Sequence, residues 1–239
     1  MFKSHKKSKW RYWSMSLLAS LSLIISFAQI SQPRNIMPGM RYVEVRTSRA
    51  AGYSSEEHWI VGDTIESQGE NLIPVYQTIN LGTDDDLSYL LIRFIKTEGE
   101  KVYILDKGEK SGKRQWLLLY DFGLNPGDWT EVYLPVEGRF IPTAMKCLEI
   151  KEDPACNGLL TMTLMPEYRG HDDSGLESSN LFTCKWIVGV GSTRGLFFPT
   201  PIGYGGGASL EKVTVGGESL FYKPVERIDL KKRRRGGGH

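Results

Sequence analysis

The fold class follows from one stretch of the sequence, Trp116–Leu134, which reads WLLLYDFGLNPGDWTEVYL. It begins with a dense apolar run over Trp116–Tyr120, which is typical of a buried β-strand. Asn125–Asp128 (NPGD) then reverses the chain, because proline and glycine supply the backbone angles that a turn requires. Trp129–Leu134 alternates apolar and polar side chains, as a strand with one buried face does. The stretch therefore predicts two strands joined by a tight turn.

The same pattern of short strands and turns recurs along the chain. Alternating or apolar runs occur at Arg41–Arg46, Leu90–Ile95, Lys101–Leu105 and Leu160–Met165. Turn residues separate these runs, and no stretch after residue 28 shows a sustained 3.6-residue apolar period with helix caps. We therefore predict an all-β fold, an antiparallel meander forming a barrel or a sandwich, preceded by an N-terminal signal helix.

The first 28 residues have the three parts of a cleavable secretory signal. The basic n-region contains Lys3, Lys6, Lys7, Lys9 and Arg11. An apolar region follows over Met15–Ala28, and Ser26 and Ala28 place small residues at the −3 and −1 positions of a cut. The apolar region is shorter than the roughly 20 residues that a membrane-spanning helix needs. We predict cleavage after Ala28 and export to the periplasm, the cell surface or the medium, with an uncleaved membrane anchor as the alternative.

The charge of the chain argues against general nucleic-acid binding. The whole chain has a net charge of +2, and the signal holds five basic residues and no acidic ones, which leaves −3 on the mature chain. Setting aside the five basic residues of Lys231–Arg235 leaves −8 on the body. An acidic body does not displace the counterions of a phosphate backbone. We predict no nucleic-acid partner, no membrane contact after signal cleavage, and an extracellular or envelope partner of unknown identity.

Composition along the chain predicts four segments. They are a signal peptide at 1–28, a polar linker at 29–40, a single β domain at 41–225 and a disordered basic tail at 226–239. About 210 residues after the signal suit one all-β domain with a hydrophobic core of its own.

Three cysteines, Cys147, Cys156 and Cys184, are available for disulfides in an exported chain. Cys147 and Cys156 flank Lys151–Pro154, which reads as a turn between two strands. We predict a Cys147–Cys156 disulfide, with Cys147–Cys184 as its competitor and three reduced or buried thiols as the remaining alternative. The C-x₂-C spacing of a zinc site is absent, and we predict no metal site.

No motif supplies catalytic or cofactor-binding residues. Gly189–Gly195 has the spacing G-x-G-x₃-G and precedes an extended segment, whereas a dinucleotide loop needs G-x-G-x₂-G and a helix. Ser192 lacks the G-x-S-x-G frame of a hydrolase nucleophile. Asp84–Asp86 lacks the alternating spacing of a calcium loop. We therefore predict no catalytic, cofactor-binding or metal-binding residues.

Four blocks of sequence carry a resemblance to a known family. The blocks are His58–Ile65 (HWIVGDTI), Glu100–Tyr103 (EKVY), Leu118–Asp128 (LLYDFGLNPGD) and Trp186–Leu196 (WIVGVGSTRGL). Together they resemble a family of secreted, uncharacterised β-domains found in Bacteroidetes bacteria, over roughly residues 55–222. The resemblance implies an exported β domain, and it implies no catalytic residue because the family has no established activity.

The residues of these blocks are expected to have structural roles. Asp63 is expected to make an Asx-turn between strands, and Asp121 to accept backbone N–H groups in the turn that follows Tyr120. The structural motif as a whole consists of Trp59, Asp63, Tyr120, Asp121, Trp186, Gly189 and Gly191.

The fourth block is expected to form part of the core. Alternation places Trp186 and Val188 on one strand face with Cys184, and we predict that Trp186 is buried. Gly189 and Gly191 are expected to serve backbone geometry and not the binding of a phosphate.

These observations favour a secreted or periplasmic, non-enzymatic β domain that binds a glycan, a protein or a small ligand. The alternatives are an extracellular, glycosidase-like hydrolase with paired carboxylates and a structural component of the envelope. The interior of the fold distinguishes them. An aromatic cavity indicates ligand binding, a cleft with two acids about 5–10 Å apart indicates a glycosidase, and a filled core indicates an interaction or structural role.

Overall fold

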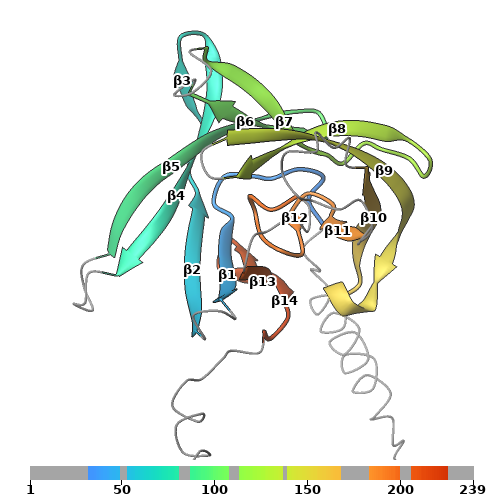
Figure 1. Ribbon diagram of the computed structural model, residues 1–239. Helices are drawn as coiled ribbons and strands as arrows, with labels where there is room; N and C mark the ends of the chain where they lie inside the picture. Colours follow the sequence, from blue (N-terminus) through green and yellow to red (C-terminus); the bar gives the residue numbers. More distant parts are fainter. Residues whose placement is uncertain are drawn as a thin grey trace, which may run out of the picture. The chain divides into compact units, whose positions relative to one another are not determined.

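Antiparallel β-strands form nearly all of the regular structure in the computed structural model of this chain (Figure 1). The structure describes residues 32–48, 53–80, 87–107, 113–136, 139–167, 183–199 and 206–225. The predicted signal at 1–28 and the predicted tail at 226–239 lie outside these residues. No helix within the described ranges is long and apolar enough to cross a membrane.

The larger sheet has nine strands and curls into a half-barrel (Figure 1). Its strands are β1 (Arg41–Ser48), β2 (Tyr53–Val61), β3 (Ile65–Ser67), β4 (Glu70–Asn80), β5 (Leu87–Glu98), β6 (Lys101–Asp106), β7 (Gln115–Asp121), β13 (Gly206–Val215) and β14 (Glu218–Tyr222). Their order across the sheet is β14-β13-β1-β2-β4-β5-β6-β7, and β3 pairs with β4.

The smaller sheet has five strands in the order β12-β11-β10-β9-β8. Its strands are β8 (Trp129–Val136), β9 (Arg139–Asp153), β10 (Leu159–Glu167), β11 (Cys184–Ile187) and β12 (Gly191–Ser192). The short 3₁₀ helix η2 (Pro154–Cys156) joins β9 to β10. Asp153 caps this helix by accepting a hydrogen bond from the amide N–H of Ala155 at 2.9 Å.

The predicted antiparallel all-β fold is confirmed, and each strand expected from alternation lies within an observed strand. The connectivity is not that of a simple meander. β1 pairs with β2 and also with β13, which is far away in the sequence. This long-range pairing brings the two ends of the domain together in one sheet.

The hydrophobic core lies inside the curve of the larger sheet and against the smaller one. Its members with almost no exposed surface include Tyr42, Val61, Val75, Ile95, Ile104, Leu119, Met145, Met162, Leu164 and Trp186. They come from both sheets, so the two sheets share one core.

The prediction of a linker over 29–40 is wrong for residues 32–40, which we call the N-terminal strap. Ile36 and Met40 are buried in the core. The segment is polar on average, but Ile36 and Met40 point to the interior whereas Met37 is exposed, and composition does not reveal that.

Gln32 fastens the start of the strap to the smaller sheet. Its side-chain amide donates hydrogen bonds to the carbonyls of Leu160 at 2.9 Å and Val188 at 3.0 Å. Its side-chain oxygen accepts from the amide N–H of Leu160 at 2.6 Å. The folded domain therefore begins about nine residues before its predicted boundary at Arg41.

Candidate functional site

One segment lies in the interior of the half-barrel. We call residues 190–199, which include β12, the plug segment, and Figure 1 shows β12 inside the curve of the larger sheet. Val190 and Leu196 have no exposed surface, and Phe197 is buried. This part of the interior is therefore occupied by the chain's own side chains.

Tyr120, near the end of β7, holds the plug segment through its hydroxyl group. The hydroxyl donates to the carbonyl of Leu196 at 2.8 Å and accepts from the amide N–H of Ser192 at 3.2 Å. The ring stacks on Phe122 with centroids 5.4 Å apart and meets Trp186 edge-on at 5.0 Å. Burial raises the pKa of the Tyr120 hydroxyl well above its ordinary value, so the hydroxyl keeps the proton that it donates.

Two further aromatic side chains bind the plug segment through their polar ends. The indole N–H of Trp186 donates to the carbonyl of Pro199 at 2.7 Å, and the hydroxyl of Tyr42 donates to the carbonyl of Val190 at 2.9 Å. Because a buried indole or phenol needs a hydrogen-bond partner, these contacts hold both ends of the segment. The prediction that Trp186 belongs to the core is confirmed, and Cys184 on the same strand is buried with it.

The glycines of the fourth block have backbone angles that other residues rarely adopt. Gly189 has φ +72° and Gly191 has φ +127°. A side chain at Gly189 would collide with the backbone of Pro33 in the N-terminal strap, whereas one at Gly191 would only touch the ring of Tyr120. Both backbone angles are those expected of glycines that serve backbone geometry.

Trp59, in β2, is buried as part of the same interior. Its ring meets Phe197 of the plug segment edge-on, with centroids 5.5 Å apart. Trp59, Tyr120 and Trp186 come from three of the four sequence blocks. Blocks that are far apart in the sequence therefore converge on one buried segment.

Glu44, in β1, places a carboxyl group in this interior with no exposed surface. Its Oε1 accepts a hydrogen bond from the amide N–H of Leu196 at 2.6 Å. Gly195 lies so close to the carboxyl group that a side chain there would overlap it. Glu44 Oε2 and the indole N–H of Trp59 are both buried, and the indole lies near the carboxyl group. The carboxyl group is thus tied to the plug segment through one oxygen.

Burial changes the acid–base behaviour of Glu44. Loss of hydration raises its pKa from 4.5 to about 7, and the charge of Glu57 adds to the rise. The hydrogen bond from Leu196, the charge of Arg46 and the nearby indole of Trp59 lower the pKa. Desolvation is the largest of these effects, as expected for a carboxyl group among apolar side chains.

Glu57, in β2, lies directly opposite Glu44 in the sheet. Its Oε2 forms an ion pair with Nε of Arg46 at 2.9 Å. The guanidinium group of Arg46 lies over the ring of Phe198, 4.8 Å from its centroid. Desolvation raises the pKa of Glu57, and the charge of Arg46 opposes this rise.

Glu44 and Glu57 are the kind of carboxylate pair that a glycosidase-like hydrolase needs, since directly opposed residues have Cβ atoms about 5 Å apart. Leu196 and Gly195 cover Glu44, however, and the carboxyl group has no exposed surface. A polymer cannot reach it in this conformation. The pair therefore lacks the open cleft that the hydrolase alternative requires.

The interior position of Glu44 has little signature in the sequence. In Arg41–Arg46 the charged residues alternate with valines, which favours an outward position for Glu44. The structure instead buries Tyr42 and Glu44 on one face of β1 and Val45 on the other. The feature of the sequence that indicates an interior position for Glu44 is Tyr42, an aromatic residue that lies on the same face of the strand.

The two aspartates of the predicted motif lie outside this interior. Asp121 accepts a hydrogen bond from the amide N–H of Gly123 at 3.1 Å, which confirms its predicted role in the turn. Lys101 Nζ lies 3.5 Å from the other oxygen of Asp121. Asp63 is exposed, and the Asx-turn predicted for it stays a prediction.

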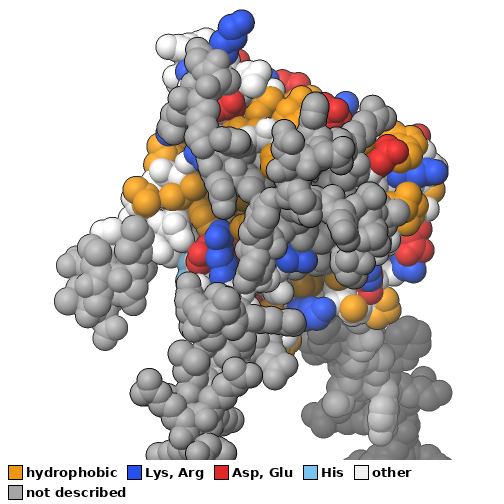
Figure 2. Space-filling view, viewed as in Figure 1, with side chains coloured by type: hydrophobic (Ala, Val, Ile, Leu, Met, Phe, Trp, Pro, Cys, Tyr) orange, Lys and Arg blue, Asp and Glu red, His pale blue; other side chains and the backbone are white. Residues whose placement is uncertain are grey.

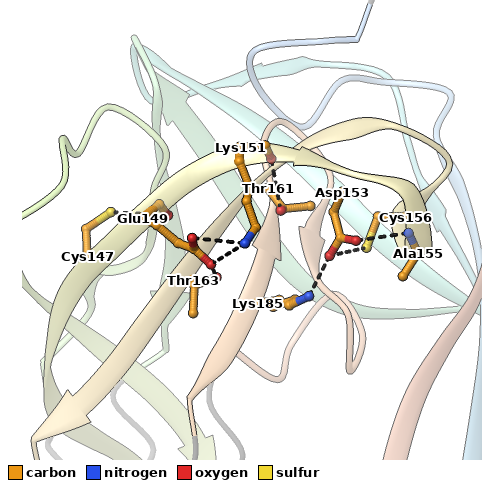
Figure 3. Close-up of polar contacts among 9 residues, drawn as sticks. All are labelled: Cys147, Glu149, Lys151, Asp153, Ala155, Cys156, Thr161, Thr163 and Lys185. Atoms are coloured by element: carbon orange, nitrogen blue, oxygen red, sulfur yellow. Dashed lines mark hydrogen bonds and ion pairs between the residues drawn. The ribbon is translucent and has the colours of Figure 1, made fainter.

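The predicted Cys147–Cys156 disulfide is not formed, and all three cysteines are buried free thiols. Cys147 pairs with Leu164 in the middle of the hairpin, whereas Cys156 lies in its turn after Asp153 (Figure 3). The six residue-to-residue steps from Cys147 to Asp153 extend over about 20 Å, far beyond the reach of a disulfide. The Cys147–Cys184 pairing is not formed either, because Leu164 pairs with both residues and lies between them.

Figure 3 also shows polar contacts across β9, β10 and β11. Lys185 Nζ lies 2.5 Å from Asp153 Oδ2, and this contact lowers the pKa of Asp153. Glu149 accepts hydrogen bonds from Lys151 at 3.0 Å and from Thr163 at 3.1 Å. Both acids have partners within the sheet, so these contacts stabilise the three strands.

Within the described ranges, no group of three or more His, Cys, Asp or Glu side chains is placed to hold a metal ion. The residues brought together in the interior are aromatic side chains, glycines and the Glu44–Glu57 pair. Comparison of the chain with protein-family models, with curated proteins and with solved structures finds no match.

Proposed function

We propose that this chain is an exported, non-enzymatic β domain that binds an extended segment of a protein partner along the free edge of β5. The filled interior supports a role for the outer surface, because the plug segment occupies the space in which a barrel-like domain holds a small ligand. The proposal rests on the edge of β5 that has no neighbouring strand.

One side of β5 lacks a neighbouring strand over most of its length. β5 pairs with β4 from Leu87 to Ile95, but it pairs with β6 only over Ile95–Glu98. On that side, Leu87–Phe94 has no strand partner in the described part of the chain, and β5 forms the margin of the sheet in Figure 1. An unpaired edge presents backbone N–H and C=O groups to which an extended peptide can add as a further strand.

The side chains beside this edge are apolar and exposed. Tyr89 is 52% exposed, Leu90 49% and Leu91 38%. Tyr89 and Leu91 lie on one face of the strand and Leu90 on the other, because side chains alternate. Tyr76 of β4 meets Tyr89 edge-on, with centroids 6.5 Å apart. Figure 2 shows hydrophobic side chains gathered over β4 and β5 at the left of the view.

An unpaired strand edge beside exposed apolar side chains favours a protein segment over a glycan as the ligand. An added strand satisfies the backbone groups of the edge, and its alternating side chains cover apolar residues on both faces. A sugar chain would stack on an aromatic ring but would leave Leu90 and the backbone edge uncovered.

Selection of peptides tests the proposal. A displayed library of random peptides is panned against residues 29–239, and we expect enrichment of extended sequences with alternating apolar residues. Leu91→Lys should weaken the selected peptides about ten-fold or more, because it places a charge in the apolar contact. Leu148→Lys, which changes an exposed leucine of β9, is the matched control and should leave binding intact. Peptides that bind both variants equally, or binding confined to a glycan array, would contradict the proposal.

Export is a separate part of the proposal. It rests on the signal pattern of residues 1–28 and on the resemblance to secreted β-domains. N-terminal sequencing of the product made in a secreting host should begin near Gln29. A membrane-bound product that retains Met1 would show that the signal is not cleaved.

A further inference from the structure

The buried contact between Glu44 and the plug segment depends on a group that can gain or lose a proton. We propose that Glu44 is a proton-controlled latch, which holds the plug segment in the half-barrel while its carboxyl group is protonated and loosens the segment when the proton is lost. This inference concerns the interior and goes beyond the binding role proposed for the β5 edge.

The geometry explains why ionisation disturbs the closed state. Oε1 of Glu44 receives the Leu196 N–H at 2.6 Å, and Gly195 packs against the carboxyl group. The side chain of Glu44 has no exposed surface, and the indole N–H of Trp59 lies near the carboxyl group as a second neutral donor. A negative charge there is poorly solvated, because these two N–H groups do not replace its lost hydration, and hydration becomes possible only when the plug segment moves away.

The neighbouring charges offset the cost of ionising Glu44 only in part, because Arg46 lowers its pKa and Glu57 raises it. The titratable or charged side chains that face it are Tyr42 and Arg46 from β1, Glu57 from β2 and Tyr120 from β7. Arg46 is ion-paired with Glu57 and is partly exposed. β13 places Leu210 opposite Glu44, and the plug segment contacts it through Leu196 and Gly195, none of which carries a charge.

The direction of the pH effect follows from the two protonation equilibria. In the closed state the pKa of Glu44 is about 7, and in an opened, hydrated state it returns toward 4.5. The closed state therefore binds the proton more tightly than the open state. The stability that protonation of Glu44 gives to the closed state is lost as the pH rises from about 4.5 through about 7. With these values the ratio of open to closed molecules increases about ten-fold between pH 6 and pH 8.5.

Hydrogen exchange on the mature chain tests the latch. Peptides that cover residues 193–198 should show an opening equilibrium about ten-fold larger at pH 8.5 than at pH 6, after correction for the intrinsic exchange rate. Peptides from β6 are the internal reference and should show no such change. Glu44→Gln should abolish the pH dependence, because the amide keeps an acceptor for the Leu196 N–H and does not titrate. Glu57→Gln is the matched control and should retain the pH dependence.

Three outcomes would overturn the latch. One is a plug segment whose opening is the same at both pH values in the unmodified protein. Another is an equal pH dependence in the Glu44→Gln variant or in the β6 peptides, because the effect would then not arise from Glu44 or would be global. If Glu44→Gln does not fold, carboxyl ¹³C resonances of the unmodified protein provide the test, and a Glu44 midpoint below pH 5.5 would overturn the proposal.

Discussion

Trp186 connects the core and the plug segment through one side chain. It has no exposed surface, its ring contacts Tyr120 and Phe122, and its indole N–H holds the carbonyl of Pro199. The apolar ring and the polar N–H therefore stabilise the fold in separable ways.

We expect Trp186→Ala to lower the free energy of unfolding by about 3–5 kcal/mol, because it leaves a cavity and an unpaired carbonyl. Trp186→Phe keeps an aromatic ring and loses the hydrogen bond, so its loss should be smaller. Urea denaturation of the two variants measures both effects. A loss below about 1 kcal/mol for Trp186→Ala would contradict a core role.

The glycines of the same block make a second prediction possible. Gly189→Ala combines a strained positive φ with a collision against the backbone of Pro33. Gly191→Ala has the positive φ but meets only the Tyr120 ring at contact distance. Gly191→Ala should cost about 1–3 kcal/mol and Gly189→Ala clearly more. Thermal denaturation ranks the variants, and the reverse order would show that the contact with the strap is not tight.

At the scale of elements, Asn157 joins the smaller sheet to the edge of the larger one. It ends η2 with φ +59°. With its amide oriented to satisfy both groups, the side chain donates to the carbonyl of Tyr222 and accepts from its N–H, each at 3.1 Å. The last strand of the larger sheet is thereby tied to the turn between β9 and β10.

Two substitutions separate the contact from the backbone angle. Asn157→Gly keeps an easy positive φ and loses both hydrogen bonds, so it should cost about 1–2 kcal/mol. Asn157→Ala loses the same bonds and adds strain, so it should cost about 1 kcal/mol more. Chemical denaturation gives the difference, and faster amide exchange at Tyr222 in both variants identifies the lost contact. Unchanged amide exchange at Tyr222 would contradict the contact between Asn157 and Tyr222.

The N-terminal strap is the other element whose role can be tested directly. Removal of residues 29–40 exposes the core surface that Ile36 and Met40 cover and deletes the Gln32 contacts. We expect a chain that begins at Arg41 to unfold at a much lower temperature than one that begins at Gln29. Equal melting temperatures would show that the strap is dispensable and that a domain boundary at residue 41 is sufficient.

At the scale of the whole molecule, stability rests on packing and hydrogen bonding without a disulfide. All three cysteines are free and buried, and burial raises the pKa of Cys184 to about 12. We expect a reducing agent to leave the denaturation midpoint unchanged. The folded protein should react slowly with a thiol reagent and take up three equivalents once denatured. A bridged peptide that contains Cys147 and Cys156 in a non-reduced digest would contradict this prediction.

β4 is an inner strand that its local sequence does not predict. Its centre carries Pro74, which lacks an N–H and argues against an inner strand. The structure accepts Pro74 because the strand is paired with β3 before it and with β2 after it, and the carbonyl of Pro74 receives the N–H of Gly62 in the connection between them. Which neighbour lies beside a proline depends on the topology of the sheet and not on the local sequence.

By itself the sequence determined the strands, their turns, the buried position of Trp186 and the backbone role of Gly189, because these depend on neighbouring residues and on a two-residue period. Only the tertiary structure decided the pairing of β1 with β13, the separation of the cysteines and the interior position of Glu44. Alternation divides a strand into two faces but does not say what covers each of them. The face that carries Glu44 is covered by Leu196, 152 residues away in the sequence.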